Sequence, residues 1–279
     1  MPPENPAPTA FFDYDGTLIE GDSILFWHRH YYARRPWMRV FQAASWVGMA
    51  LNAARVIDSH ALKRVFLWPL AFENPETLDA LGREFVLNDL AFRFHGPVLA
   101  RLWAHHRLGH RVVVISASGT FYLRHLAELL PPGCVVLGTE MRWEGGFLRL
   151  PSYRGGNLRG PNKITRLRDL GYAGAGKGGF AYSDHPHDVP LLEFVDHPNC
   201  IRPTRGMAAE AGRHGWPVWE WPRARAAWKV KAEALFLLLF AWSPKFLAAP
   251  KESPKPDEAE VERQEKLIGI ETQNDGMMK

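Results

Sequence analysis

Two aspartates, Asp13 and Asp15, stand two residues apart, directly after an apolar run that ends at Phe12. Residues two apart on an extended strand project to the same side, so we expect the two carboxylates to lie close together. Two like charges at that distance are costly unless a cation binds them. A hard divalent ion with oxygen ligands, such as Mg²⁺, is the expected cation. The pair therefore predicts a metal-assisted reaction on an anionic substrate such as a phosphate ester.

Further positions along the chain could complete such a site. Asp184 follows another apolar run, and Asp188 comes four residues later. Asp184 could reach the same ion. Ser116 offers a hydroxyl, and the backbone amides of Ala117 and Ser118 lie near a predicted helix start, where an anion is favoured. Lys163, at the start of another predicted helix, would neutralise negative charge at a transferring phosphoryl group.

Apolar strands alternate with helical segments along much of the chain. This pattern predicts an α/β fold, a Rossmann-like doubly wound parallel sheet with helices on both faces. In such sheets ligands bind at the carboxyl ends of the strands, which is where the candidate residues fall. We expect strands over 9–12, 111–115, 134–138 and 179–182, and helices over 97–108, 120–130, 162–170, 188–195 and 205–214.

One long stretch breaks this alternation and carries no strand pattern. It predicts an inserted all-helical cap with helices at roughly 22–34, 38–56, 60–68 and 75–88. The charged, proline-rich end of the chain has the composition of a disordered tail. We therefore expect a catalytic core over 1–19 and 96–222, a helical cap over 20–95, a basic and apolar helix over 223–247, and a disordered tail over 248–279.

The run Asp-Tyr-Asp-Gly-Thr at 13–17, with Ser116, Lys163 and the segment from Asp184 to Asp188, resembles the four signature motifs of the haloacid dehalogenase-like (HAD) superfamily. Their order and strand-end placement match, over residues 9 to about 205. The helical insertion resembles subfamily IB, which contains phosphoserine phosphatase and phosphatidylglycerophosphatase C. Where the usual pattern has a glycine before the first aspartate of the last motif, this chain has Ser183. The resemblance implies a HAD-like phosphomonoesterase.

The resemblance also implies a role for each carboxylate. Asp13 would attack phosphorus to form an aspartyl-phosphate, and Asp15 would protonate the leaving oxygen and later deprotonate the hydrolytic water. An aspartate is ionised at neutral pH, so Asp13 needs no separate base. Mg²⁺ would be held by the Asp13 side chain, the Asp15 backbone carbonyl and Asp184, with Asp188 in supporting contact. Related dehalogenases lack the second carboxylate of the first motif, so Asp15 argues against dehalogenation.

Three residues are candidates for substrate contact. Phosphoserine phosphatases place an acidic residue just after the first motif and an arginine in the cap, which points to Asp22 and Arg64 here. For Arg64, a plain surface charge is an equal alternative. His187 is predicted to face the substrate or a loop, because a carboxylate site for Mg²⁺ does not favour imidazole. His105 is predicted to lie on the surface.

Two apolar segments bear on the identity of the substrate. Residues 40–54 carry no charge, and the run 234–242 has basic residues on both sides. Both are shorter than the about 20 residues that span a bilayer, but they suit attachment to an anionic lipid surface. Packing inside the protein is the alternative. The preferred substrate is therefore a phospholipid head-group phosphate such as phosphatidylglycerophosphate. The alternatives are phosphoserine or another small metabolite, and an inactive membrane-associated binding protein.

Composition sets the remaining expectations. With 279 residues and 46% hydrophobic content, the chain can form a substantial core. Its net charge of +4 is too small to indicate nucleic acid binding. Two cysteines without paired spacing support neither a disulfide framework nor a cysteine zinc site. The N-terminus lacks the pattern of a secretory signal, so a cytoplasmic location is expected, with peripheral attachment to the inner face of the membrane as the alternative.

Overall fold

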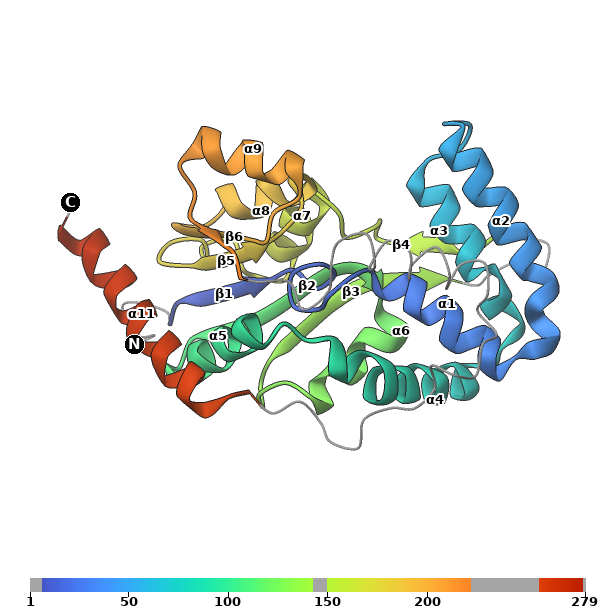
Figure 1. Cartoon of the computed structure of the whole chain (residues 1–279), viewed down its shortest axis with the longest axis horizontal. Helices are drawn as coiled ribbons and strands as arrows, with labels where there is room; N and C mark the ends of the chain where they lie inside the picture. The colour runs from blue at the N-terminus through green and yellow to red at the C-terminus, as the bar shows by residue number, and fades with distance from the viewer. Residues whose placement is uncertain (1–6, 143–149, 222–255, 278–279) are drawn as a thin grey trace.

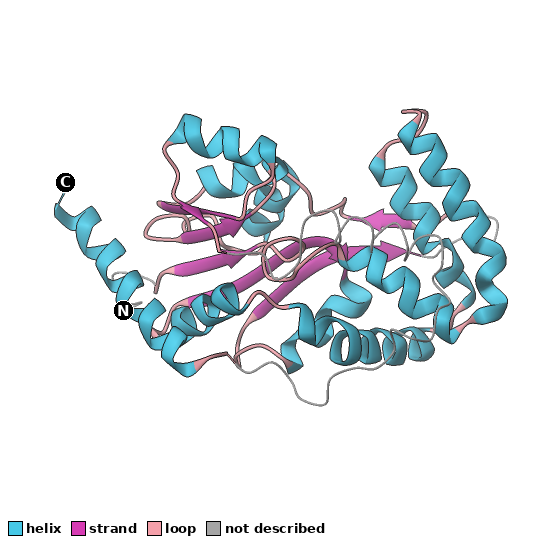
Figure 2. Cartoon of the chain, in the orientation of Figure 1, coloured by secondary structure: helices cyan, strands magenta, loops and turns pink. Residues whose placement is uncertain are grey.

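The computed structural model describes residues 7–142, 150–221 and 256–277, and it is built around one seven-stranded sheet (Figures 1 and 2). The strand order is β4-β3-β2-β1-β5-β6-β7. β4 pairs antiparallel with β3, and every other neighbouring pair is parallel. The strands are β1 (Thr9–Phe12), β2 (Arg111–Gly119), β3 (Val135–Arg142), β4 (Ser152–Arg154), β5 (Phe180–Ser183), β6 (His197–Ile201) and β7 (Val218–Trp219).

The central strand β1 is buried on both faces. Ala10 and Phe12 point into the larger hydrophobic cluster, and Phe11 points into the smaller one on the other side of the sheet. This is the two-residue period of a strand, and it explains why the run is apolar at every position. Because β1 pairs with both β2 and β5, the residues that follow all three strands meet at one edge.

Helices cover both faces of the sheet, which confirms the predicted doubly wound α/β fold. In Figure 1 the helices α7, α8 and α9 lie on one side of the sheet, and α5 and α6 lie on the other. Their bounds are α5 (Gly96–Arg107), α6 (Thr120–Leu123), the 3-10 helix η5 (Arg124–Glu128), α7 (Pro161–Asp169), η6 (Pro186–Asp188), α8 (Val189–Glu193) and α9 (Arg205–His214).

The chain between β1 and α5 is helical. An isolated bridge between Ile19 and Phe94 joins its two ends. Its elements are α1 (Ser23–Arg34), η1 (Pro36–Arg39), α2 (Val40–Ala53), α3 (Ser59–Leu67), η2 (Trp68–Phe72), α4 (Pro75–Phe85), the π-helix η3 (Val86–Leu90) and η4 (Ala91–Arg93). We call this segment the cap; its exact limits as a separate unit stay a prediction.

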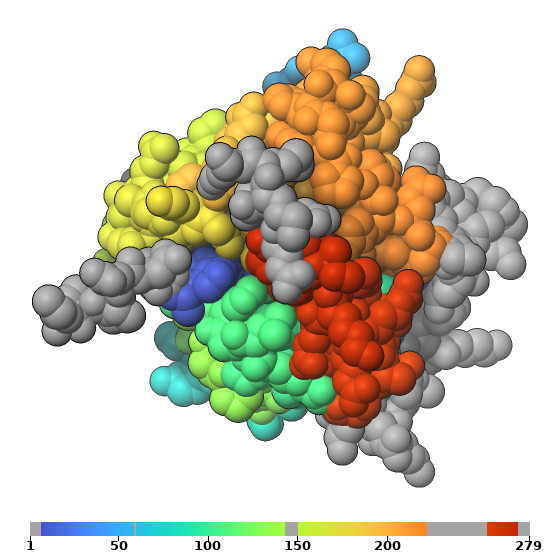
Figure 3. All heavy atoms as spheres, turned by 90° about the vertical axis from the view of Figure 1, so that its left-hand side faces the viewer, coloured from blue at the N-terminus to red at the C-terminus, as the bar shows by residue number. Residues whose placement is uncertain are grey.

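The end of the chain departs from the predicted disorder. Residues Glu258–Met277 form the helix α11, which lies along α5 (Figure 3). Val261 and Ile268, two turns apart, are buried there, and the buried Arg101 of α5 donates to the side chains of Gln264 and Glu271. The prediction of a disordered tail is therefore wrong for 258–277, because a narrow apolar stripe is enough to dock a highly charged helix. The predicted helix over 223–247 lies outside the described residues.

His105 also departs from its predicted surface position. It is fully buried beneath the sheet, where its Nε2 lies 2.7 Å from the hydroxyl of Tyr182 and its Nδ1 lies 2.9 Å from Nδ1 of His110. The buried face of α5 passes over β1 and β5, so a polar residue on that face must find its partners there. Within the described parts of the chain, no helix is long and apolar enough to cross a membrane.

Candidate active site

The candidate residues gather at the carboxyl ends of the three central strands. Asp13 follows β1, Asp184 follows β5, and Ser116 lies in the second half of β2. Lys163 reaches them from the first turn of α7. Segments far apart in sequence thus supply one site because their strands are neighbours in the sheet.

Asp13, Lys163 and Asp188 form a buried charge cluster. The Lys163 Nζ lies 2.6 Å from Asp13 Oδ1 and 2.8 Å from Asp188 Oδ2, and all three side chains are buried. Ser183 donates its hydroxyl to Asp188 at 2.8 Å. The serine that stands where the family pattern has glycine therefore holds a carboxylate of the site. Lys163 bridges the candidate nucleophile and a second acid.

The Asp15 carboxylate has a different set of partners. Its Oδ1 accepts from the backbone amide of Ser23 at 2.6 Å, and its Oδ2 accepts from Ser118 at 2.6 Å and from Ser116 at 3.3 Å. Ser23 Oγ in turn lies 2.9 Å from Ser118 Oγ and 2.8 Å from the hydroxyl of Tyr122. Asp15 is therefore held in one orientation by cap and core together.

The loop after β1 requires a glycine at one position. Gly16 has a φ of +81°, and a Cβ there would lie 2.5 Å from Asp184 Oδ2. Any other residue would be strained and would push Asp184 away. Next to it, Thr17 Oγ1 lies 3.5 Å from Asp13 Oδ2 and 3.3 Å from Asp184 Oδ1. The Asp13 and Asp184 carboxylates therefore converge on one point.

Burial sets the electrostatics of this cluster. Burial raises the pKa of Asp13 well above its ordinary value, despite the opposing charge of Lys163. Burial, with the nearby charge of Asp188, raises the pKa of Asp184 to about 7. For Lys163, burial alone would lower the pKa, but Asp13 and Asp188 outweigh it and the pKa rises. When ionised, Asp13, Asp184 and Asp188 together carry more negative charge than the single positive charge of Lys163 neutralises.

This arrangement suits a hard divalent cation beside Asp13 and Asp184. Among the described residues, no three His, Cys, Asp or Glu side chains are grouped so that they could hold a metal ion by themselves. Mg²⁺ does not require such a group, because it usually keeps several waters and binds one or two carboxylates. The side chains of Asp13 and Asp184 and the backbone carbonyl of Asp15 are the donors that would hold it. Asp188, already bonded to Lys163 and Ser183, is in a supporting position.

The predicted cap residues take different positions. Asp22 is the exposed N-cap of α1 and accepts from the amide of Ile24 at 3.0 Å. Arg64 points to the backbone carbonyl of Pro151, at 2.6 Å from its Nε, and so it does not face the cluster. Its neighbour Lys63 instead donates to the carbonyl of Ala117, at the end of β2. Ala117 belongs to residues 116–118, which are predicted to bind phosphate and which we call the phosphate loop.

The remaining two predicted residues are Ala117 and His187. The Ala117 carbonyl also accepts from Thr139, at 2.8 Å, so its peptide is held from the core as well as from the cap. His187 is exposed, and its ring stacks on that of His185 with centroids 4.5 Å apart. His187 therefore stands at the rim of the site, not among its carboxylates.

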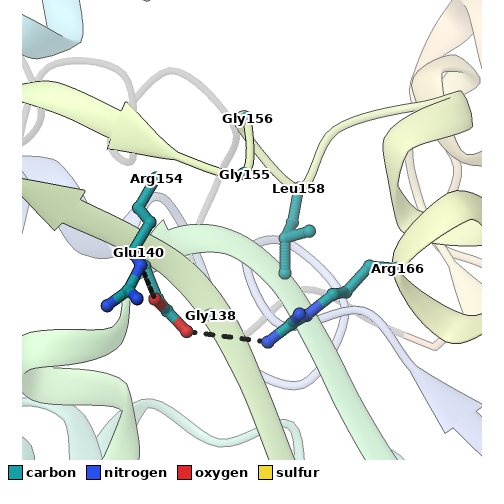
Figure 4. A pocket seen from close by; sticks show the side chains of 7 residues that line it. All are labelled: Gly138, Glu140, Arg154, Gly155, Gly156, Leu158 and Arg166. Atoms are coloured by element: carbon teal, nitrogen blue, oxygen red, sulfur yellow. Dashed lines mark ion pairs between the residues drawn. The ribbon is translucent and has the colours of Figure 1, made fainter. Parts of the chain in front are cut away.

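A pocket of about 370 Å³ lies elsewhere (Figure 4). Within it Glu140 sits between Arg154, at 3.8 Å, and Arg166, at 3.6 Å. None of the catalytic candidates lines it. The candidate active site is therefore assigned from the chemistry of the carboxylate cluster and not from the size of this pocket.

Lys63 gives a prediction about substrate binding. Replacing Lys63 by methionine is expected to raise KM for a phosphate ester by roughly 10-fold to 100-fold, the effect of losing one charged hydrogen-bond donor. Burial lowers the pKa of Lys63 to about 8, so its charge is lost as the pH rises through that value. We expect kcat/KM of the unmodified protein to fall above about pH 8 and this fall to be absent in Lys63→Met.

The matched control is Arg64→Met, which removes a cation from the next position of the same helix. Because Arg64 bonds to carbonyls of Pro151 and Leu150, its loss is expected to leave KM nearly unchanged. Steady-state kinetics across pH measures both variants. A larger increase in KM for Arg64→Met than for Lys63→Met would indicate that Arg64, and not Lys63, is the cap residue that contacts the substrate.

Several site residues escaped the sequence interpretation. For Ser118 only the backbone amide was predicted to contribute; its hydroxyl carried a usable signal, because Ser118 stands two residues after Ser116 and so shares its side of the strand. Thr17 lies inside the first motif but was not assigned a contact. Ser23 and Tyr122 gave no signal, because their proximity to Asp15 depends on how the cap folds back over the core.

Comparison with known proteins agrees with this geometry. Residues 10–193 match the family described as haloacid dehalogenase-like hydrolase. The chain is 26% identical over 219 residues to a histidinol-phosphatase of Neisseria meningitidis, covering 75% of this chain and 96% of that one. It is 28% identical over 240 residues to a phosphoserine phosphatase of Mycobacterium tuberculosis, covering 82% and 76%. A Bordetella pertussis protein of unknown function shares the fold, with a TM-score of 0.64, 23% identity and coverage of 77% and 99%.

Proposed function

Because the chain belongs to the haloacid dehalogenase-like hydrolase family and is a phosphomonoesterase, we propose that it works through an aspartyl-phosphate on Asp13 and depends on Mg²⁺. One observation carries this proposal: the buried Asp13 carboxylate is bonded to Lys163 at the end of the central strand, with Asp15 oriented beside it. That is the arrangement of a fixed nucleophile and a separately held acid.

In the first half of the reaction, a carboxylate oxygen of Asp13 attacks phosphorus and the bond to the ester oxygen breaks. Asp15 gives that oxygen a proton, so the alcohol leaves neutral. In the second half, Asp15 takes a proton from water, which attacks phosphorus and releases phosphate and free Asp13. Ser116 and Lys163 offer donors to the phosphoryl oxygens.

When bound, Mg²⁺ would offset the charge of the phosphoryl group and of the two carboxylates nearest to it. Asp13 and Asp184 favour such an ion, because burial without it raises the pKa of both groups. Asp188 and Lys163 hold the Asp13 side of the cluster in place.

For the substrate, we propose the phosphate ester of a small amino alcohol. The two named relatives carry the names of enzymes acting on histidinol phosphate and phosphoserine, and both of these esters have an ammonium group on the carbon next to the ester CH₂. In this chain the exposed Asp22 carboxylate caps the helix that starts beside Asp15, so it is a suitable acceptor for that ammonium group. Lys63 supplies the opposite charge from the cap.

A phospholipid head-group phosphate is the second candidate. The observation in its favour is the exposed apolar surface of α2 in the cap, where Val40 and Val47 face outward. A lipid phosphatase must work at a membrane surface, and such a face suits that location. The inactive binding protein is disfavoured, because the nucleophile, the acid and the lysine occur together in one cluster.

A substrate panel tests both candidates. With Mg²⁺ present, we expect kcat/KM for phosphoserine or histidinol phosphate to exceed that for p-nitrophenyl phosphate by at least about 10-fold, since cap contacts add binding only to the specific ester. Chelation should abolish turnover and added Mg²⁺ should restore it. A preference for phosphatidylglycerophosphate in micelles would select the second candidate. Turnover that survives chelation would refute the metal dependence, and no turnover of any ester would refute the enzyme.

A further inference from the structure

The helix α2 buries small and polar residues and exposes large apolar ones, which is the reverse of an ordinary surface helix. Its buried positions are Gln42, Ser45 and Gly48, whereas Val40 is 72% exposed and Val47 is 59% exposed. A helix on a protein surface ordinarily buries its apolar stripe and turns polar residues to water. Here the small and polar residues face inward. Packing within the protein therefore does not explain why the outward face is apolar.

Close packing on α3 accounts for the inner face. A Cβ at Gly48 would lie 3.2 Å from Leu62 and 3.3 Å from Val65, so the two helices approach closely at this point. The Ser45 hydroxyl is buried and donates to the carbonyl of Phe41 at 3.4 Å, within its own helix. Small residues permit this contact, and they leave the larger apolar side chains on the side away from α3.

The apolar surface continues beyond both ends of the helix. Trp37, just before it, is 65% exposed, and Val56, just after it, is 67% exposed. Val40, Val47 and Leu51 recur at spacings of seven and four, which places them on one stripe. We define the outer face of α2 as Trp37, Val40, Val47, Leu51 and Val56.

The charged residues of this segment are all basic, as far as the exposed Asp58 that caps α3. Residues 34–57 contain four arginines and no acidic residue. Arg34 and Arg35 pair with glutamates of the cap, whereas Arg39 and Arg55 are exposed at the two ends of α2. An apolar stripe with basic ends and a tryptophan at its margin is the pattern of a helix that lies in the surface of an anionic bilayer.

We propose that the outer face of α2 binds the surface of an anionic lipid membrane, with the helix parallel to the bilayer plane. In Figure 1, α2 and α3 stand together at the end of the molecule opposite α11, so the face is presented at an extremity. The bound helix brings α3 and its Lys63, which contacts the phosphate loop, close to the membrane. Vesicle binding by this face does not depend on which phosphate ester is hydrolysed.

The test is flotation of the full chain with vesicles that mix phosphatidylglycerol and phosphatidylcholine. The protein is expected to float with these vesicles and to stay unbound with phosphatidylcholine alone. Val40→Glu/Val47→Glu should lower the partition coefficient by at least about 10-fold, because two apolar side chains can no longer enter the bilayer. Arg39→Gln/Arg55→Gln should weaken binding to the anionic vesicles by about fivefold for each arginine.

Leu108→Glu/Leu170→Glu is the matched control, since both leucines are exposed elsewhere on the protein. It should bind as the unmodified protein does. Turnover of p-nitrophenyl phosphate confirms that each variant is folded, and if the α2 glutamates prevent folding, the arginine variant decides. The proposal is overturned if the unmodified protein does not float, or if a folded Val40→Glu/Val47→Glu floats equally well. A dimer in light scattering that the α2 glutamates dissociate, without flotation, would also overturn it and assign the face to a second copy.

Discussion

Asp13→Asn is expected to lower the turnover of a phosphate monoester by about 10⁴-fold or more, because the amide cannot form the acyl-phosphate. The substitution keeps the shape of the side chain, and Lys163 can still donate to the amide oxygen from 2.6 Å. The fold should therefore persist. Steady-state kinetics and far-ultraviolet circular dichroism together separate loss of the nucleophile from loss of structure.

Asp15→Asn is the informative companion, because it removes the acid and keeps the nucleophile. The p-nitrophenolate leaving group needs little protonation, so this variant should release one equivalent rapidly and then stall with phosphate on Asp13. Intact-mass analysis should find one added phosphoryl group in Asp15→Asn and none in Asp13→Asn. A burst with Asp13→Asn, or a phosphorylated peptide that lacks residue 13, would assign the nucleophile to another residue.

Replacing Lys163 by methionine is expected to destabilise the protein by about 3–5 kcal/mol in the absence of Mg²⁺ and to remove activity. The substitution leaves Asp13 and Asp188 buried without their shared cation, and unpaired buried charges carry a cost of this size. Urea unfolding at several pH values measures the loss. Lys177→Met, at an exposed lysine, is the control and should change stability by less than about 0.5 kcal/mol.

The pH dependence of this loss has a defined sign. Burial raises the pKa of Asp13 above its unfolded value, so folding favours the protonated form of Asp13. In Lys163→Met the stability deficit should therefore grow as the pH rises above about 4, the ordinary pKa of an aspartate, and shrink below it. Asp188→Asn in the same chain should recover part of the loss at neutral pH, because one buried charge is gone. Full additivity of the two substitutions would mean that the three groups are not coupled.

Much of the fold follows from local sequence. The strands β1, β2 and β5 read as apolar runs because both of their faces are covered. β3 was found from the same apolar pattern, although most of its residues are only half-buried. β6 could not be found in this way, because His197, Pro198 and Asn199 break its apolar pattern. It forms a strand because it pairs with β5. α11 was missed because its charged composition outweighs the few residues that contact α5. Such elements are fixed by their neighbours, which a single sequence does not display.

The candidate site likewise contains residues that the sequence reveals and residues that it does not. Asp13, Ser116, Lys163 and Asp184 could be found from strand-end placement and motif order, and the structure brings them together. The cap contacts could not be found from the sequence. Lys63 and Arg64 are adjacent on one helix, and the rotation of that helix about its axis decides which of them faces the phosphate loop. Motif spacing fixes the reacting groups, whereas the rotation of a helix in the inserted segment fixes what surrounds the leaving group.

The pairing of β1 has a consequence for how the active site comes into existence during folding. Residues 9–12 pair with 111–114 on one side, and residues 10–12 pair with 180–182 on the other. Both contacts close long loops, and contacts of high sequence separation form slowly. Asp184 and Asp188 follow β5, so these carboxylates reach Asp13, the proposed nucleophile, only after β5 has joined the sheet. We therefore expect hydrolysis only from the completed core. In partly folded forms with β1 still unpaired, the Asp13 carboxylate lacks its partners in the site and is expected to be inactive.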